Sequence, residues 1–560
     1  MAAKSYDLLI VGGGITGAAI AWDASLRGLK VALVEKDDFA HATTAGSSKL
    51  IHGGLRYLVN GEIGLVRIAL RERRIWETIA PHMVFPLPFV LPTYGRGMKG
   101  KLIHTLGLTL YDLLSWDRNC LSDDDKKLPR HTSLSRAQTL ALMPSLKPDS
   151  LTGAKLYYDC QMFAPERLCF EMIASAAEYG ADVANYARVT DFESDGSLEG
   201  GARITGVRLE DRLTGQSHTI AAALTINATG PWADTMMGLA EGGEPARRLI
   251  RSKGIHLITR ALSGDHALAI RTAMGGHFFV LPWRGHTILG TTDTLYEGDP
   301  DKLGVSERDI ADFLTVVNDA LPGLHLSRQD VRHAYAGIRP LVEPPQEATD
   351  RRQTADKENE KKPYTASRAA EIIDHKKLDE LDGLISAMGG KWTTSRHLAE
   401  QIVDLAYQKL NRPLTKSETH GTPLYGGEMG RYRSFVARAV KRHPTLPPEV
   451  VEHLCRYYGS RIDELLATAD EKPGERAELV QRLSPKGCDL GVQIVHAARH
   501  EMALRLTDVL FRRTGLGTLG HPGTDIIEKA AALMARERDW DPVEKARQIA
   551  EAEAAFIQAP

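Results

Sequence analysis

The chain begins with YDLLIVGGGITG at residues 6–17 and reaches KVALVE at residues 30–35. The first apolar run predicts a strand, residues 18–27 a helix, and the second apolar run another strand. In this βαβ pattern Gly12 permits the tight turn, Gly14 lets a pyrophosphate approach, and Gly17 allows close helix–strand packing. Glu35 can accept the hydroxyls of an adenosine ribose and would repel a 2′-phosphate, which argues against NADP. The segment therefore predicts a nucleotide-binding α/β domain.

A polar loop follows this fingerprint. Residues 41–57, HATTAGSSKLIHGGLRY, have no apolar periodicity and are dense in hydroxyls, glycines and cations. Such a composition suits backbone that wraps a polar ligand. An ordinary Ser/Thr/Gly loop is the alternative, but it leaves His52 and Arg56 without an explanation. The fingerprint alone does not separate FAD from NAD.

Length and composition limit the classes of protein that fit. A chain of 560 residues is too long for one core, so two or three domains are expected. A net charge of −2 argues against nucleic-acid binding. The five cysteines are scattered, odd in number and without a C-x-x-C, which indicates a reducing compartment and no metal site. We expect neither a signal peptide, since the fingerprint starts at residue 6, nor a transmembrane helix.

Residues 42–58 resemble the flavin loop of FAD-dependent glycerol-3-phosphate dehydrogenases. These respiratory, membrane-associated enzymes belong to the D-amino-acid-oxidase-like flavoprotein group. Six later segments are similar to the family in the same order, so that the resemblance covers nearly the whole chain. They are NATGPWA at 227–233, KGIH at 253–256, PW at 282–283, LGTTD at 289–293, GIRPL at 337–341 and GGKWTT at 389–394.

The resemblance implies FAD as cofactor and sn-glycerol 3-phosphate as substrate. Hydride would pass to flavin N5, giving dihydroxyacetone phosphate, and the electrons would pass to a membrane quinone. It further implies a peripheral location on the cytoplasmic face of the inner membrane, and a homodimer is compatible with it. A glycerol-3-phosphate oxidase using O₂, and an amine or amino-acid oxidase of the same fold, stay open as alternatives. Net charge and scattered cysteines disfavour a regulatory or tRNA-modifying flavoprotein.

The resemblance also assigns site residues. Arg56 and Arg339 are expected to grip the phosphate, since a guanidinium pairs with phosphate oxygens bidentately. His52 and His256 are the candidate bases, and Arg339 could instead polarise the hydroxyl; the sequence does not rank them. Tyr57, Lys391 and Thr393 are expected beside the substrate. The cofactor-binding residues are Gly12, Gly14, Ile15, Thr16, Gly17, Glu35, Lys36, Thr43, Thr44, Ser47, Ser48, Lys49, Leu50, His52, Gly53, Gly54, Val189, Ala228, Thr229, Gly230, Trp232, Gly389, Gly390, Lys391, Trp392 and Thr393.

The expected architecture has three parts. A Rossmann-like FAD-binding domain (about 1–80, 150–250 and 375–415) is interleaved with an antiparallel-sheet substrate domain (about 81–149 and 251–374). Residues 416–560 form a C-terminal helical domain. Its helices are expected at 431–443, 448–458, 461–469, 490–513 and 523–555, with His496, Arg499, His500, Arg512 and Arg513 at a surface or interface.

Three further segments carry open interpretations. The polar insertion at 343–362 is expected to be a mobile loop. Residues 98–116 are leucine-rich, with basic residues at the start and an aromatic end. A helix lying in a membrane interface and a buried core helix would both have this pattern, and the buried core helix is the preferred interpretation. Arg67, Arg71 and Arg74 lie at helical spacing and form either a solvated face or a contact with anionic lipid.

Overall fold

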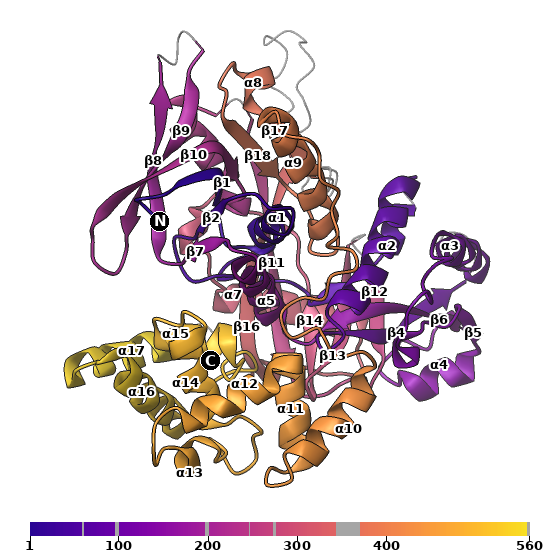
Figure 1. Cartoon of the computed structure of the whole chain (residues 1–560). Helices are drawn as coiled ribbons and strands as arrows, with labels where there is room; N and C mark the ends of the chain where they lie inside the picture. Colours follow the sequence, from indigo (N-terminus) through magenta and orange to yellow (C-terminus); the bar gives the residue numbers. More distant parts are fainter. Residues whose placement is uncertain are drawn as a thin grey trace.

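The structure is a computed structural model that describes residues 1–58, 61–95, 100–196, 201–245, 247–272, 276–342 and 370–556. Two sheets and a helical region make up the molecule (Figure 1). The insertion expected at 343–362 lies outside the described residues.

The first sheet is the nucleotide-binding one. Its order is β17-β18-β10-β1-β2-β7, with β9 paired to β10 and β8 paired to β9. β1 runs parallel to both β10 and β2, and α1 packs against α5 and α9. Its elements are β1 (Ser5–Val11), α1 (Ile15–Leu26), β2 (Val31–Val34), α5 (Pro165–Glu178), β7 (Asp182–Ala184), β8 (Ala187–Asp195), β9 (Arg203–Asp211), β10 (Ser217–Asn227), β17 (Glu371–Asp374), β18 (Leu384–Met388) and α9 (Ser395–Lys409). All four residues of β2 are buried, as expected for parallel strands covered on both faces.

The second sheet is mostly antiparallel, in the order β15-β11-β14-β13-β12-β4-β6-β3, with β16 on β11 and β5 on β6. Its strands are β3 (Leu50–Ile51), β4 (Val84–Tyr94), β5 (Thr132–Leu134), β6 (Leu151–Met162), β11 (Leu249–Thr259), β12 (Ala267–Arg271), β13 (His277–Trp283), β14 (His286–Gly290), β15 (Thr294–Leu295) and β16 (Val331–Val342). β6 pairs with β4 along its length. The expected domain boundaries placed β3 and β6 with the nucleotide domain and β17 with the substrate domain, whereas hydrogen bonds join β3 and β6 to this sheet and β17 to the first one. The division into domains otherwise stays a prediction.

The C-terminal region is helical, and two of its expected helices are divided. α14 (Gly491–His500) ends before Met502, whose φ is 54°, and Val509–Arg513 is a separate π-helical turn. α16 (Thr524–Arg538) ends at Asp539 in a left-handed conformation, and Pro542 opens α17 (Pro542–Phe556). A residue in that conformation commonly ends a helix, so the continuous predictions at 490–513 and 523–555 were wrong. The remaining helices are α10 (Tyr432–Arg442), α11 (Pro448–Tyr458), α12 (Ile462–Ala467), α13 (Arg476–Leu479) and α15 (Leu506–Asp508).

The tandem arginines of that turn lie at an interface and not at the surface. Arg512 and Arg513 are buried, and both donate to the carboxylate of Asp38, just after β2. Burial alone would raise the pKa of Asp38, but the two guanidiniums hold it well below its usual range. Arg167 on α5 pairs with Glu501 at 2.7 Å in the same buried region. These contacts fasten the C-terminal helices to the nucleotide domain.

α3 (Lys101–Leu114) does not have the buried core position that was favoured for residues 98–116. Its buried residues are Leu108 and Tyr111, whereas the side chains of Leu102, Leu106 and Leu113 are 71%, 61% and 66% exposed. Figure 1 shows the helix at the rim of the molecule. Among the helices of the described residues, none has the length and apolarity needed to cross a membrane.

The arginines of α2 (Ile63–Ile79) are paired with acids, so a plain solvated face, one of the two interpretations left open for them, does not describe them. Arg67 donates to both carboxylate oxygens of Asp117, at 2.7 and 3.0 Å, and Arg74 lies 3.4 Å from the same group. Arg71 approaches Glu72 at 3.3 Å.

Candidate functional site

A cavity of about 1210 Å³ lies where the β1–α1 turn, the 41–57 loop, β16 and the start of α9 come together. Most of the predicted residues line it. They are Gly12, Gly14, Ile15, Thr16, Glu35, Lys36, Thr43, Thr44, Ser47, Ser48, Leu50, His52, Tyr57, Val189, Ala228, Thr229, Gly230, Trp232, His256, Arg339, Gly389, Gly390, Lys391, Trp392 and Thr393. Five predicted residues do not line the cavity, namely Gly17, Lys49, Gly53, Gly54 and Arg56. The volume is large enough for a dinucleotide and a small substrate.

The turn after β1 has the geometry of a pyrophosphate cradle. Gly12 has φ of 112°, and a Cβ there would lie 2.7 Å from the Ala228 carbonyl oxygen. A Cβ on Gly17 would lie 1.9 Å from the Gly12 oxygen, so Gly17 serves packing and need not touch a ligand. The backbone at this end leaves room for a phosphate and for no side chain.

Glu35 closes the same end of the cavity. Its carboxylate accepts hydrogen bonds from the backbone N–H groups of Gly13 at 2.7 Å and Asp37 at 2.9 Å. Burial raises the pKa of Glu35, while the two backbone donors oppose that rise. A carboxylate held in this way can accept from a ribose hydroxyl, the role that the sequence predicted.

The start of α9 is fixed from α2. The backbone N–H of His52 donates to Thr393 Oγ1 at 3.2 Å, and Trp76 Nε1 donates to the Thr393 carbonyl at 3.0 Å. The rings of Trp76 and Trp392 lie 5.1 Å apart, so the bulky Trp392 packs on α2 while still lining the cavity. The sequence did not single out Trp76, because its partners lie more than 300 residues away.

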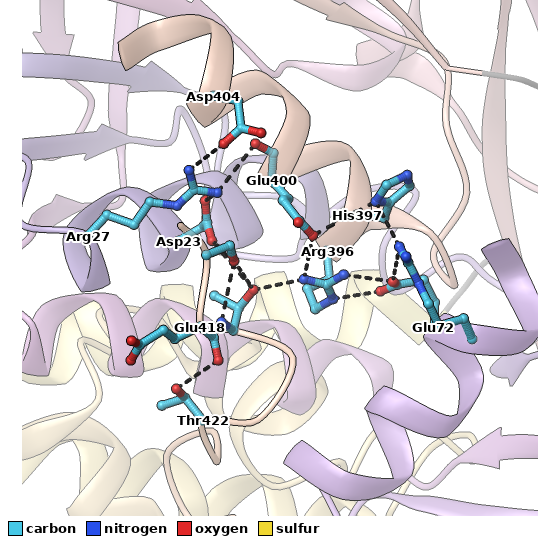
Figure 2. A network of polar contacts seen from close by, with 12 residues as sticks. Asp23, Arg27, Glu72, Arg396, His397, Glu400, Asp404, Glu418 and Thr422 are labelled. Atoms are coloured by element: carbon cyan, nitrogen blue, oxygen red, sulfur yellow. Dashed lines mark hydrogen bonds and ion pairs between the residues drawn. The ribbon is translucent and has the colours of Figure 1, made fainter. Parts of the chain in front are cut away.

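A buried ion pair adds to this attachment. Arg396 donates to both carboxylate oxygens of Glu72 at 2.7 Å, and neither side chain is more than 2% exposed. Figure 2 shows the pair within a network that also includes Glu400, and Arg27 with Asp23 and Asp404. The network joins α1, α2 and α9, and so holds the cavity-facing start of α9 in place. Arg396 and Glu72 carry no motif that would have revealed the pair.

His256 has one polar neighbour, Ser48, and one aromatic neighbour, Tyr335. Its Nε2 is 2.8 Å from Ser48 Oγ, and its ring stacks on Tyr335 at 4.8 Å. Burial, with smaller contributions from the charges of Arg339 and Lys49, holds the pKa of His256 well below its usual range. The imidazole is therefore neutral near pH 7, and one of its ring nitrogens carries no proton.

The guanidinium of Arg339 is oriented by β11 and by the segment between β14 and β15. Its Nη1 donates to Ser252 Oγ at 3.0 Å and lies 3.3 Å from Asp293, and its Nη2 donates to Thr291 Oγ1 and the Thr292 carbonyl at 2.9 Å each. A Cβ on Gly254 would lie 2.4 Å from Nη2. Gly254 therefore leaves the space that the guanidinium occupies.

The other predicted cations differ in their placement. Lys391 Nζ lies 3.5 Å from the centre of the Tyr57 ring inside the cavity. Arg56 lies outside the lining and meets His277 Nδ1 at 3.3 Å. Lys49 points into the protein, where its Nζ is 3.6 Å from Glu166 and burial lowers its pKa.

Comparison with known proteins agrees with this geometry. Residues 7–404 match the model of the FAD dependent oxidoreductase family, and residues 417–545 match the C-terminal domain of alpha-glycerophosphate oxidase. The chain belongs to the FAD-dependent oxidoreductases, and FAD fits the glycine cradle and the Glu35 carboxylate described above.

Within that family, the chain is similar to glycerol-3-phosphate dehydrogenases. It is 37% identical to the enzyme of Synechocystis sp., covering 91% of this chain and 89% of the relative. It is 34% identical to the aerobic glycerol-3-phosphate dehydrogenase of Staphylococcus haemolyticus, covering 91% and 87%. Among solved structures, the FAD complex of the glycerol-3-phosphate dehydrogenase from Bacillus halodurans is 29% identical, with a TM-score of 0.77 over 100% of this chain and 96% of that one.

Proposed function

We propose that this enzyme oxidises sn-glycerol 3-phosphate to dihydroxyacetone phosphate. Similarity to glycerol-3-phosphate dehydrogenases over 91% of the chain carries the proposal, and the cations at the cavity support it. FAD, when bound, supplies the acceptor for the hydride that leaves C2. The protein's own residues must then bind the phosphate, orient C2 and remove the proton of its hydroxyl.

His256 is the base that the geometry favours within this proposal. It is 2% exposed, neutral and stacked on Tyr335, so it is oriented and can accept the hydroxyl proton. Lys391 and Arg339 offer positive charge to the substrate from the cavity wall. Arg56 would take part in phosphate binding only if its guanidinium turned from His277 toward the cavity.

The direct test is an anaerobic spectrum of the purified, FAD-loaded protein. Glycerol 3-phosphate should bleach the flavin absorbance and yield one dihydroxyacetone phosphate per flavin. Glycerol, which lacks the phosphate, and glycine, the simplest amino-acid substrate, are the matched controls. Bleaching by glycine and not by glycerol 3-phosphate would contradict the proposal and favour an amino-acid oxidase.

We further propose that the electrons pass to a membrane quinone and that the protein binds peripherally to the cytoplasmic face of the inner membrane. The outer face of α3 supports peripheral binding, since Leu102, Leu106 and Leu113 are exposed and Trp116, just beyond the helix, is 74% exposed. Contiguous exposed apolar residues with a terminal tryptophan are typical of a helix that lies in a membrane interface.

Charge at one end of α3 favours anionic lipid as the surface. Lys101 opens the helix and is exposed. Burial lowers the pKa of His104 on α3, and the positive charge of Arg271 lowers it further. Arg271 therefore lies close to the same end of α3 as Lys101. Cations beside an apolar helix face suit phosphate headgroups above acyl chains.

Docking is tested by cosedimentation with vesicles of phosphatidylcholine and phosphatidylglycerol in equal parts. Leu106→Asp combined with Leu113→Asp should abolish binding, because each buries a charge in the interface. Leu213→Asp, at an exposed leucine on another part of the molecule, is the control and should bind normally. Equal binding of both variants would place the contact elsewhere.

The products of the reaction identify the electron acceptor. The dehydrogenase predicts quinone reduction with little peroxide, whereas the oxidase predicts one peroxide per substrate in air and no response to quinone. A match to an oxidase's C-terminal domain alongside dehydrogenase relatives leaves this choice to the experiment. The homodimer stays a prediction.

A further inference from the structure

One face of α3 is exposed and the opposite face is buried. Leu102, Leu106 and Leu113 point outward, while Leu108 and Tyr111 lie on the opposite side and are its buried residues. A helix with two buried side chains is weakly fixed by packing. A contact along its outer face would therefore restrain it considerably.

Tyr111 reaches from α3 to the flavin-binding segment. The backbone N–H of Gly53 donates to Tyr111 Oη at 3.0 Å and to Asp159 Oδ1 at 3.2 Å. Tyr111 in turn donates to Asp159 at 2.7 Å, and Arg73 on α2 pairs with the same carboxylate at 2.6 Å. All of these groups are buried, and a Cβ on Gly53 would lie 2.4 Å from Tyr111 Oη. The Tyr111 side chain is thus fitted closely to the backbone next to His52.

A second connection runs from the end of α3 through α2. Asp117, three residues beyond the helix, accepts both Arg67 donors. The opposite side of α2 carries Glu72, which pairs with Arg396 of α9 (Figure 2), and Trp76, which donates to the Thr393 carbonyl. Both cavity-lining segments, around His52 and around Thr393, are therefore bonded to α2 or α3.

We propose that Tyr111 is a positioning residue that transmits the docking of α3 on anionic lipid to the flavin-binding segment at His52–Gly53. The inference rests on the proposed lipid docking. Lipid fixes the outer face of α3, and Tyr111 then holds the Gly53 N–H in one place, which orders the cavity wall for turnover.

The test uses the FAD-loaded protein with glycerol 3-phosphate and a water-soluble dye as acceptor, so that delivery of quinone by lipid cannot cause stimulation. Vesicles of phosphatidylcholine and phosphatidylglycerol should raise kcat/KM of the wild type about fivefold, the scale of one hydrogen bond. Tyr111→Phe should bind the vesicles equally but show less than about twofold stimulation. Tyr157→Phe is the control, because this buried tyrosine lies on β6 with its ring 6.1 Å from that of Tyr111. It should keep the stimulation.

A measurement on the wild type covers the case in which Tyr111→Phe does not fold. Hydrogen exchange should slow on vesicle binding in peptides covering residues 50–58 as well as in α3. Protection of α3 alone, or full stimulation of Tyr111→Phe, would overturn the proposal. Binding without stimulation would overturn the coupling and leave docking standing, whereas failure to bind vesicles would overturn docking and the coupling together.

Discussion

Two carboxylates that follow β2 belong to regions of opposite character. Glu35 faces the cavity and accepts from the backbone of Gly13, 22 residues away in the same βαβ unit. Asp38 is fully buried against the C-terminal region. Its carboxylate accepts hydrogen bonds from Arg512 and Arg513, more than 470 residues away in the chain. The cavity wall is built from local backbone donors and leaves room for a ligand. The junction is built from side chains of distant segments that satisfy one another. Substitutions in the wall should alter binding and turnover, and substitutions in the junction should alter stability.

The largest effect is expected at the junction. Asp38→Asn would leave two buried guanidiniums without their full counter-charge, which should lower the free energy of unfolding by about 3–5 kcal/mol. Urea denaturation followed by circular dichroism measures the loss. Glu478→Gln, which breaks the exposed pair with Arg536, should cost less than about 1 kcal/mol. Equal effects of the two variants would remove the distinction between junction and surface.

In the cavity wall, Arg339→Lys keeps the charge but loses the planar fork that spans Ser252 and Thr291. The loss should cost about 2–4 kcal/mol of transition-state binding, a fall in kcat/KM of roughly thirtyfold to a thousandfold. Steady-state kinetics with glycerol 3-phosphate measure it. Flavin content should stay normal, because the proposed FAD contacts lie elsewhere; a normal kcat/KM would show that Arg339 does not act on the substrate.

A second contact of the C-terminal helices, between β16 and α17, should respond to pH through His333. This buried residue of β16 faces Phe556 of α17, and burial, with a smaller contribution from Lys49, lowers its pKa to about 4. The unfolded chain, with a pKa of about 6.5, binds more protons between these values, so stability falls as pH drops through that window.

The protonation of His333 should lower the free energy of unfolding by about 2–3 kcal/mol between about pH 7 and pH 4. His333→Asn should lack it in paired urea denaturation curves at the two pH values. His256, His41 and His496 also have lowered pKa values, and their contribution of the same sign should persist in the variant. Identical pH dependence of variant and wild type would contradict the assignment.

The smallest effect concerns the carboxylate on the cavity side. Glu35→Gln removes the charge that should accept the ribose hydroxyls and weakens the bond from Gly13. The Kd for FAD should rise about tenfold, the scale of one charged hydrogen bond. Titration of the FAD-free protein with FAD, followed by flavin fluorescence, measures it. Unchanged affinity together with reduced stability would move Glu35 to the same class as Asp38.

Residues whose partners lie close in the chain could be predicted from the sequence. The glycine turn, Glu35 and the loop at 41–57 carry a recognisable pattern because the ligand meets backbone of one βαβ unit and the segment after it. The family resemblance likewise depended on short motifs, most of which contribute residues to the cavity wall. Arg396 with Glu72, and Trp76 with Thr393, were not predicted, because an arginine, a glutamate or a tryptophan in an amphipathic helix has no distinguishing pattern.

The sequence by itself determined the nucleotide-binding unit and the FAD-dependent class, and most of the site residues that it predicted line the cavity. Only the tertiary structure decided that Arg512 and Arg513 are buried on Asp38, that β6 joins the second sheet, and that the outer face of α3 is uncovered. A strand or helix can be read from local periodicity, but its burial depends on which distant segment covers it. For the leucines of α3, hydrophobicity indicated a buried face, and no segment of the described chain packs over it.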